Sequence, residues 1–175
     1  MSELSLEIAT IEQLRSIHAA KSAALAMFDP MLSKVAAERD DPASSAEVAE
    51  LLGRMHNVFS GHRAETAEHA RRLAARLGDL GSAPAGFRTG GLSLAAKAWV
   101  LANGFGGQDH GANARNAFVF EHLEIASLSL LEQLGERQAD GGTAELARHC
   151  LAQDKEMAAT IDRNWTNVLT LSLAP

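Results

Sequence analysis

The sequence has no tyrosine, a single cysteine and few aromatic residues of any kind. Sheets favour aromatic and β-branched side chains, whereas alanine and leucine, which dominate this chain, favour helices. The lone Cys150 excludes an internal disulfide, which is typical of a reducing compartment. The lack of tyrosine also removes a common radical partner of redox metal centres. These absences predict a helical protein rather than a disulfide-stapled or sheet-rich one.

The chain also lacks a basic surplus, a signal sequence and a long apolar run. Its formal net charge of -6 disfavours a nucleic-acid partner. The first residues, MSELSLEIATIEQL, show no basic region followed by an apolar stretch. No apolar run approaches the roughly 20 residues that a membrane-spanning helix needs. We therefore expect a cytoplasmic protein with neither a nucleic-acid nor a membrane partner.

Four long segments carry apolar residues at alternating spacings of three and four, the pattern of helices packed in a bundle. These segments span about 4–38, 45–77, 112–138 and 143–171. Pro30 lies inside the first segment and predicts a kink rather than an end. Short polar turns join the first segment to the second and the third to the fourth. Each of these two pairs is therefore expected to form an antiparallel hairpin.

A long glycine-rich connection, about 78–111, separates the two hairpins. One short amphipathic helix, at about 92–102, is expected inside it. So long a connection is unusual between neighbouring antiparallel helices, but it suits a crossover from one hairpin to the other. The predicted fold is a single all-α domain, residues 1–175: a ferritin-like up-down four-helix bundle with a long crossover between its second and third helices.

Polar residues interrupt all four apolar stripes at comparable depth. Carboxylates are rarely buried unless they are paired or bind a metal, and facing carboxylates and imidazoles can hold divalent ions. The interruptions are His18 and Lys21 in the first segment, His62, Glu65 and His69 in the second, Glu121 and Glu124 in the third, and Asp154 in the fourth. The candidate metal ligands are Glu65, His69, Glu121, Glu124, Asp154 and His62. His110, His122 and His149 fall outside the stripes and are expected at the surface.

Four stretches resemble a known bacterial family. HRAETAEHARRL (62–73), FEHLEIAS (120–127) and LAQDKEM (151–157) look like segments of the ferritin-like family typified by the stress-associated protein YciF, and IEQLRSIHAAKSAAL (11–25) is similar to its first helix. The resemblance implies a ferritin-like bundle that is commonly dimeric, carries a candidate di-metal centre and is associated with stress response.

The match to the family pattern is incomplete. Glu65, His69, Glu121 and Glu124 agree with it, and His62 stands where the family often has histidine. The family typically offers a glutamate at the place of Lys21, an acid at the place of Ala158, and a glutamate at the place of Asp154. The ligands on the second and third helices are therefore expected to be intact. Those on the first and fourth helices are expected to be partly replaced.

Two functional hypotheses remain open at this point. In the first, the ammonium of Lys21 lies among Glu65, Glu121 and Asp154 and neutralises them in place of a metal, because a buried lysine needs paired acids. The protein would then be a non-catalytic, stress-associated bundle that acts as a homodimer or a partner-binding module. In the second, the residues bind iron or manganese and the protein consumes oxygen or peroxide.

Overall fold

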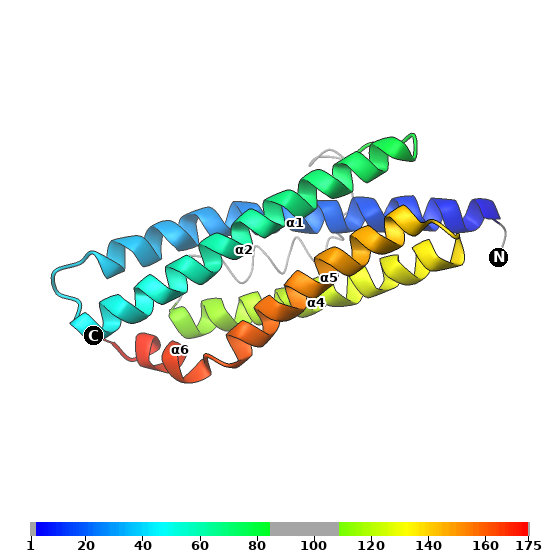
Figure 1. Cartoon of the computed structure of the whole chain (residues 1–175). Coiled ribbons are helices and arrows are strands. Elements are labelled where there is room, and N and C mark those ends of the chain that lie inside the picture. Colours follow the sequence, from blue (N-terminus) through cyan, green and yellow to red (C-terminus); the bar gives the residue numbers. More distant parts are fainter. Residues whose placement is uncertain (1–2, 85–108, 175) are drawn as a thin grey trace.

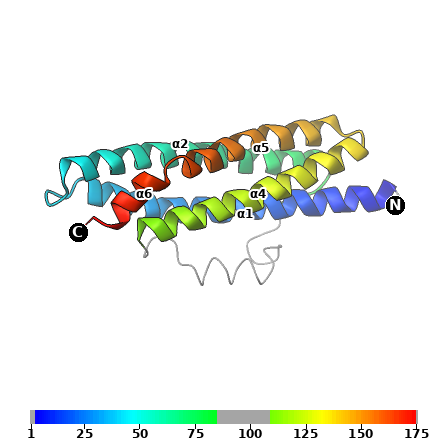
Figure 2. The same cartoon turned by 90° about the horizontal axis from the view of Figure 1, so that it is seen from below.

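The computed structural model describes residues 3–84 and 109–174, which form an elongated bundle of helices (Figures 1 and 2). The long helices are α1 (Glu3–Arg39), α2 (Ala46–Asp79), α4 (His110–Arg137) and α5 (Gly141–Asp162), and a short helix, α6 (Trp165–Ser172), follows. α1 and α2 form one antiparallel hairpin, and α4 and α5 form the other (Figure 1). The all-α bundle of two hairpins is therefore confirmed. The short helix expected at 92–102 lies outside the described residues.

Side-chain caps set the starts of three helices. Ser45, Asp109 and Asp140 accept hydrogen bonds from backbone amides in the first turns of α2, α4 and α5. Asp140 also accepts a hydrogen bond of 2.7 Å from Nη2 of Arg76, which comes from the other hairpin. One capping residue therefore starts a helix and ties the two hairpins together at this end of the bundle.

The fourth segment departs from the expectation of one helix. α5 ends at Asp162 and α6 begins at Trp165, because Asn164 turns its side-chain amide back onto the carbonyl oxygen of Thr160. Such a side-chain bond competes with the helical backbone pattern. The core stripe of this segment therefore ends at Ile161. α1, in contrast, continues through Pro30 as a single helix, as expected.

The buried residues form separate apolar clusters along the bundle. One cluster includes Leu14, Leu73 and Leu128, and a second includes Phe28 and Phe59. On every long helix, the polar residues singled out above lie between these two clusters in the sequence. The polar centre is therefore enclosed by apolar layers on both sides along the bundle axis. None of the described helices is long and apolar enough to cross a membrane.

Gly135 marks the closest approach of α4 to α5 and supplies a stability prediction. A Cβ atom at this position would lie 2.7 Å from the backbone nitrogen of Ala144 and 3.1 Å from its Cα. Because a helix backbone cannot easily yield, Gly135→Ala should lower the free energy of unfolding by about 1–3 kcal/mol. Urea denaturation measures the change. Gly61→Ala, where no atom lies within 4 Å, is the control and should raise stability by about 0.5–1 kcal/mol.

Candidate functional site

The candidate site is a cluster of buried polar side chains at mid-length in the bundle. Each long helix contributes to it, because positions three or four residues apart on a helix share one face. Its members are all buried: Lys21 from α1, His62, Thr66 and His69 from α2, Glu121 and Glu124 from α4, and Asp154 from α5. Below, these seven residues are called the polar centre.

Lys21 lies at the middle of this network. Its Nζ donates to both carboxylate oxygens of Asp154 at 2.8 Å and to Oε2 of Glu124 at 2.9 Å. The side chain is 0% exposed. Burial alone lowers the pKa of Lys21, but the charges of Glu124 and Asp154 outweigh it and raise the pKa above its usual range. The ammonium is therefore charged, and it binds α1 to α4 and α5.

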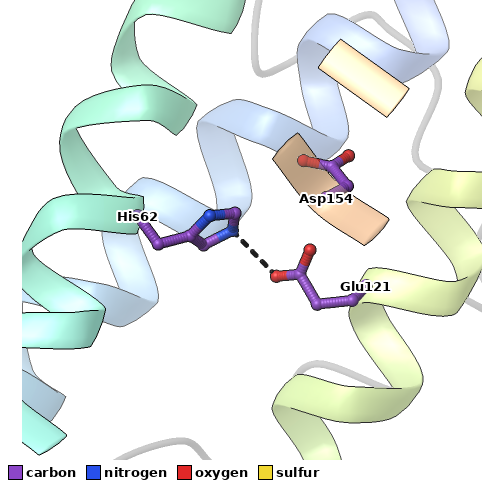
Figure 3. Close-up of side chains that lie close together, drawn as sticks. All are labelled: His62, Glu121 and Asp154. Carbon is purple, nitrogen blue, oxygen red and sulfur yellow. Dashed lines mark hydrogen bonds and ion pairs between the residues drawn. The ribbon is translucent and has the colours of Figure 1, made fainter. Parts of the chain in front are cut away.

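His62 makes the second connection, from α2 to α4. Its Nε2 lies 2.9 Å from Oε1 of Glu121, and its Nδ1 lies 3.3 Å from Oε2 of Glu65. Figure 3 draws the contact between His62 and Glu121 as a dashed line. The ring also meets Phe28 edge-on, with ring centroids 5.8 Å apart. Burial lowers the pKa of His62, but the hydrogen bond and charge of Glu121 raise it above its ordinary value. This balance favours an imidazolium–carboxylate pair inside the bundle.

His69 and Glu124 are held in less common protonation states. Burial, followed by the charge of Lys21, lowers the pKa of His69, whose Nε2 lies within hydrogen-bond reach of Gln153. Its Nδ1 is 3.7 Å from Oδ1 of Asp154. Burial raises the pKa of Glu124 to about 8, against the lowering effect of Lys21. The polar centre therefore contains a neutral histidine and a carboxyl group that titrates near neutral pH.

These pKa shifts predict a pH dependence of stability. His62 has a folded pKa above its unfolded value, so its contribution is present below about pH 6.5 and is lost as the pH rises through the folded pKa. Glu124 releases its proton near pH 8 when folded but near pH 4.5 when unfolded, so stability again falls as the pH rises between these values. His69 and His18, whose folded pKa values lie below the unfolded value, oppose this trend below about pH 6.5. We therefore expect the free energy of unfolding to decrease from about pH 6.5 to pH 8, by up to about 1.4 kcal/mol per pH unit for each group.

Denaturation with urea across this range measures the slope. Glu124→Gln, which keeps the shape but cannot titrate, should give a flatter profile than the unchanged chain. A stability that rises steadily from about pH 6.5 to pH 8 would contradict the assignment of His62 and Glu124.

Among the described residues, one group has the donor geometry of a metal site. Nitrogen or oxygen atoms of His62, Glu121 and Asp154 all lie within 4.8 Å of one another, and all three side chains are buried. Figure 3 shows these side chains pointing towards one another from α2, α4 and α5. Oε2 of Glu121 is buried and has no hydrogen-bond partner. An imidazole and two carboxylates suit a single divalent transition-metal ion.

A pair of metal ions fits the polar centre poorly. Two ions about 3.5–4 Å apart would need bridging or terminal carboxylates from facing helices. Glu124 and Asp154, which would supply them, already bind the ammonium of Lys21 at 2.8–2.9 Å. An ammonium and a metal cation cannot both take these oxygens at short distance without strong repulsion. The donor set therefore fits two ions poorly, and a single ion at His62, Glu121 and Asp154 would have to take an oxygen of Asp154 from Lys21.

The structure places the residues predicted from sequence as follows. Glu121, Glu124, Asp154, His62 and His69 meet inside the bundle. Glu65 does not join them, because its side chain is 42% exposed and contacts only the outer nitrogen of His62. His18 is half-buried and outside the polar centre.

Three details differ from the sequence expectations. Lys21 pairs with Asp154, as expected, but its other partner is Glu124 rather than Glu65. His110, expected at the surface, is buried and lies 2.7 Å from Oε2 of Glu38. Gln153, the partner of His69, was missed, and no periodicity signal could have found it, since it lies beside the apolar stripe of its helix.

Comparison with solved structures identifies the fold. A bacterioferritin from Desulfovibrio desulfuricans, whose description names a diiron site, matches with a TM-score of 0.71 and 16% identity over 99% of this chain and 87% of that one. Dps from Thermosynechococcus elongatus matches with a TM-score of 0.68 and 12% identity over 93% and 94% of the two chains. A protein from Xanthomonas campestris pv. campestris matches with a TM-score of 0.67 and 16% identity over 97% and 96%.

At identities this low, the similarity establishes the ferritin-like fold and nothing further. No curated protein matches the chain. One family model does, over residues 6–174, and its description is Domain of unknown function (DUF892). The chain therefore belongs to the DUF892 family, the YciF-like group, and has the ferritin-like four-helix bundle.

Proposed function

We propose that this protein is a stress-associated ferritin-like bundle in which a lysine takes the place of the metal pair, and that it is not a di-iron oxidase. One observation carries the proposal: Nζ of Lys21 binds both oxygens of Asp154 and one oxygen of Glu124 in a fully buried position. The association with stress response rests on the resemblance to the YciF family alone.

The charges of the polar centre support a centre that needs no metal. Lys21 lies against Asp154 and Glu124, and His62 lies against Glu121. These acids raise the pKa of both Lys21 and His62, so the basic groups favour their cationic forms. The acids of the polar centre therefore have cationic partners within the protein, which satisfies the requirement that buried ions be paired.

The same contacts give the polar centre a structural role. Lys21 of α1 contacts α4 and α5, and His62 of α2 contacts α4, so each helix of the first hairpin is bonded to the second hairpin. Buried hydrogen bonds and ion pairs of this kind form only when the helices are aligned in one register. Apolar contacts, in contrast, can persist when one helix slides along another. The network is thus suited to fixing how the two hairpins align.

A second candidate function is binding of one divalent metal ion. It is favoured by the converging atoms of His62, Glu121 and Asp154 and by the unpartnered Oε2 of Glu121. These three residues would hold the ion, which would supply Lewis-acid or one-electron chemistry when bound. The ion would take one oxygen of Asp154 from Lys21, which would stay paired with Glu124 and would exclude a second ion.

Elemental analysis of the protein purified from cells supplied with iron and manganese tests these alternatives. The main proposal expects less than one metal ion per ten chains, and the second expects one ion per chain that Glu121→Gln removes. Two ions per chain would refute both. A matched assay of ferrous iron oxidation in air should show no acceleration over buffer.

We also propose that the chain self-associates as a homodimer. The outward face of α4 exposes Val119, Leu123 and Leu130, which is unusual for large aliphatic side chains on a monomer surface when they gather along one helix. Sedimentation equilibrium should give twice the chain mass, and Leu123→Lys should shift the protein towards the monomer. A monomeric unchanged chain at micromolar concentration would refute the proposal.

A further inference from the structure

A cavity of about 300 Å³ lies between α2, α5 and α6, away from the oxygens and nitrogens of the polar centre. A hollow of this size is at the lower end of the range found for small-molecule sites. Arg54 and Val58, which line it, are exposed, so the hollow is open to solvent and a small ligand can enter it.

The break between α5 and α6 accounts for the hollow. Because α5 stops at Asp162, the chain leaves the line of the helix and returns as α6 against another part of the bundle. Phe59, Met157 and Ile161, which line the cavity, belong to the apolar cluster next to the polar centre. Leu171 lines it from another cluster. The apolar wall is thus made of packed core residues and is preformed.

Polar groups also line the cavity. Arg54, Asn164 and Asn167, which have polar side chains, are among the residues that line it. Nδ2 of Asn167 donates to Oδ1 of Asn164 at 2.8 Å, and Nδ2 of Asn164 donates to the carbonyl of Thr160 at 2.7 Å. Each amide nitrogen carries a second hydrogen, so the pair is oriented and still able to donate.

The guanidinium of Arg54 is available for a ligand at small cost. Its partner in the structure is Glu50, one turn away on the same helix, and the two side chains are 57% and 71% exposed. Exposed pairs of this kind stabilise a protein by well under 1 kcal/mol. A carboxylate that brings an apolar tail into the cavity can therefore replace Glu50.

We infer that this cavity binds a medium-chain fatty acid, with its alkyl chain against Phe59, Met157 and Ile161 and its carboxylate near Arg54. A volume of about 300 Å³ holds roughly ten heavy atoms at the ~30 Å³ that a water molecule occupies in the liquid. Octanoate has this size.

Titration calorimetry with sodium octanoate tests the inference on the whole chain. The unchanged protein should bind octanoate, and n-octanol, which has the same tail without the charge, should bind about two- to fivefold more weakly. Arg54→Gln should weaken octanoate binding by a similar two- to fivefold, because an ion pair at an exposed guanidinium contributes at most about 1 kcal/mol. Arg63→Gln, a change of a partly exposed arginine on the same helix but outside the cavity, should leave binding unchanged.

Two further measurements locate the site. Octanoate should shift the side-chain amide NMR signals of Asn164 and Asn167, and Val58→Trp, which places a large ring at the cavity wall, should abolish binding. Arg54 and Val58 are exposed, so both variants are expected to fold. Circular dichroism checks that they do. No heat and no amide shift with folded protein would overturn the inference. Equal affinity for octanol, or undiminished binding in folded Val58→Trp, would overturn it as well.

Discussion

Lys21→Met is expected to lower the free energy of unfolding by about 3–5 kcal/mol at pH 7. Methionine keeps the length and apolar stem of lysine but removes the ammonium that Asp154 and Glu124 share. Removing one partner from a buried ion pair leaves the other charge without compensation, which costs far more than losing a surface pair. Denaturation with guanidinium chloride at pH 7 measures the loss.

A matched control separates the effect of losing the ion pairs of Lys21 from the general effect of losing a lysine. Lys155 is exposed on α5, so Lys155→Met should change stability by no more than about 0.5 kcal/mol. The defect of Lys21→Met should be larger at pH 9 than at pH 7, because Glu124 loses its proton near pH 8 and its carboxylate then needs a cation. A loss below 1 kcal/mol at pH 7 would show that Lys21 is not the residue that neutralises these acids.

Lys21→Glu is expected to make the stability of the protein depend on metal. The change places a carboxylate beside Glu124, Asp154 and Glu121, and like charges this close cannot all remain ionised in a buried site. Without metal, the variant should be less stable than Lys21→Met. Manganese(II) at about 1,000 times its dissociation constant should then restore about 4 kcal/mol. For a chain of this length, that corresponds to a rise in Tm of about 8–16 °C.

Differential scanning calorimetry with and without manganese(II) measures this rise. Lys21→Gln is the control, since it removes the ammonium without adding a negative ligand, and its Tm should rise by no more than 2–3 °C. Equal responses of the glutamine and glutamate variants would mean that position 21 does not face the metal-binding oxygens.

The depth of the polar centre could be predicted from sequence, but its pairing could not. The spacing of Lys21, His62, Glu121 and Asp154 placed them on inward faces, because helical periodicity determines which side of a helix a residue occupies. It does not determine which neighbour a long flexible side chain reaches. Lysine therefore bonds Glu124, and Glu65, at the edge of the same face, turns towards solvent.

The contacts at helix ends also could not be predicted from the sequence. His110 is the first residue of α4, where the periodic pattern has not yet begun, and its burial comes from the end of α1 through Glu38. The break at Asn164 depends on a side-chain bond to Thr160, and asparagine makes such bonds in only some contexts. The fold could be predicted because apolar periodicity persists over many helical turns. A single side-chain hydrogen bond produces no repeating pattern in the sequence, so the helix break could not be predicted.

The most direct test of the central claim is the anomalous difference map of crystals soaked in manganese(II). The proposed network predicts no peak between Asp154 and Glu124, with the amine of Lys21 within hydrogen-bond distance of both carboxylates. Two manganese peaks bound by these carboxylates, with Lys21 displaced from them, would contradict it.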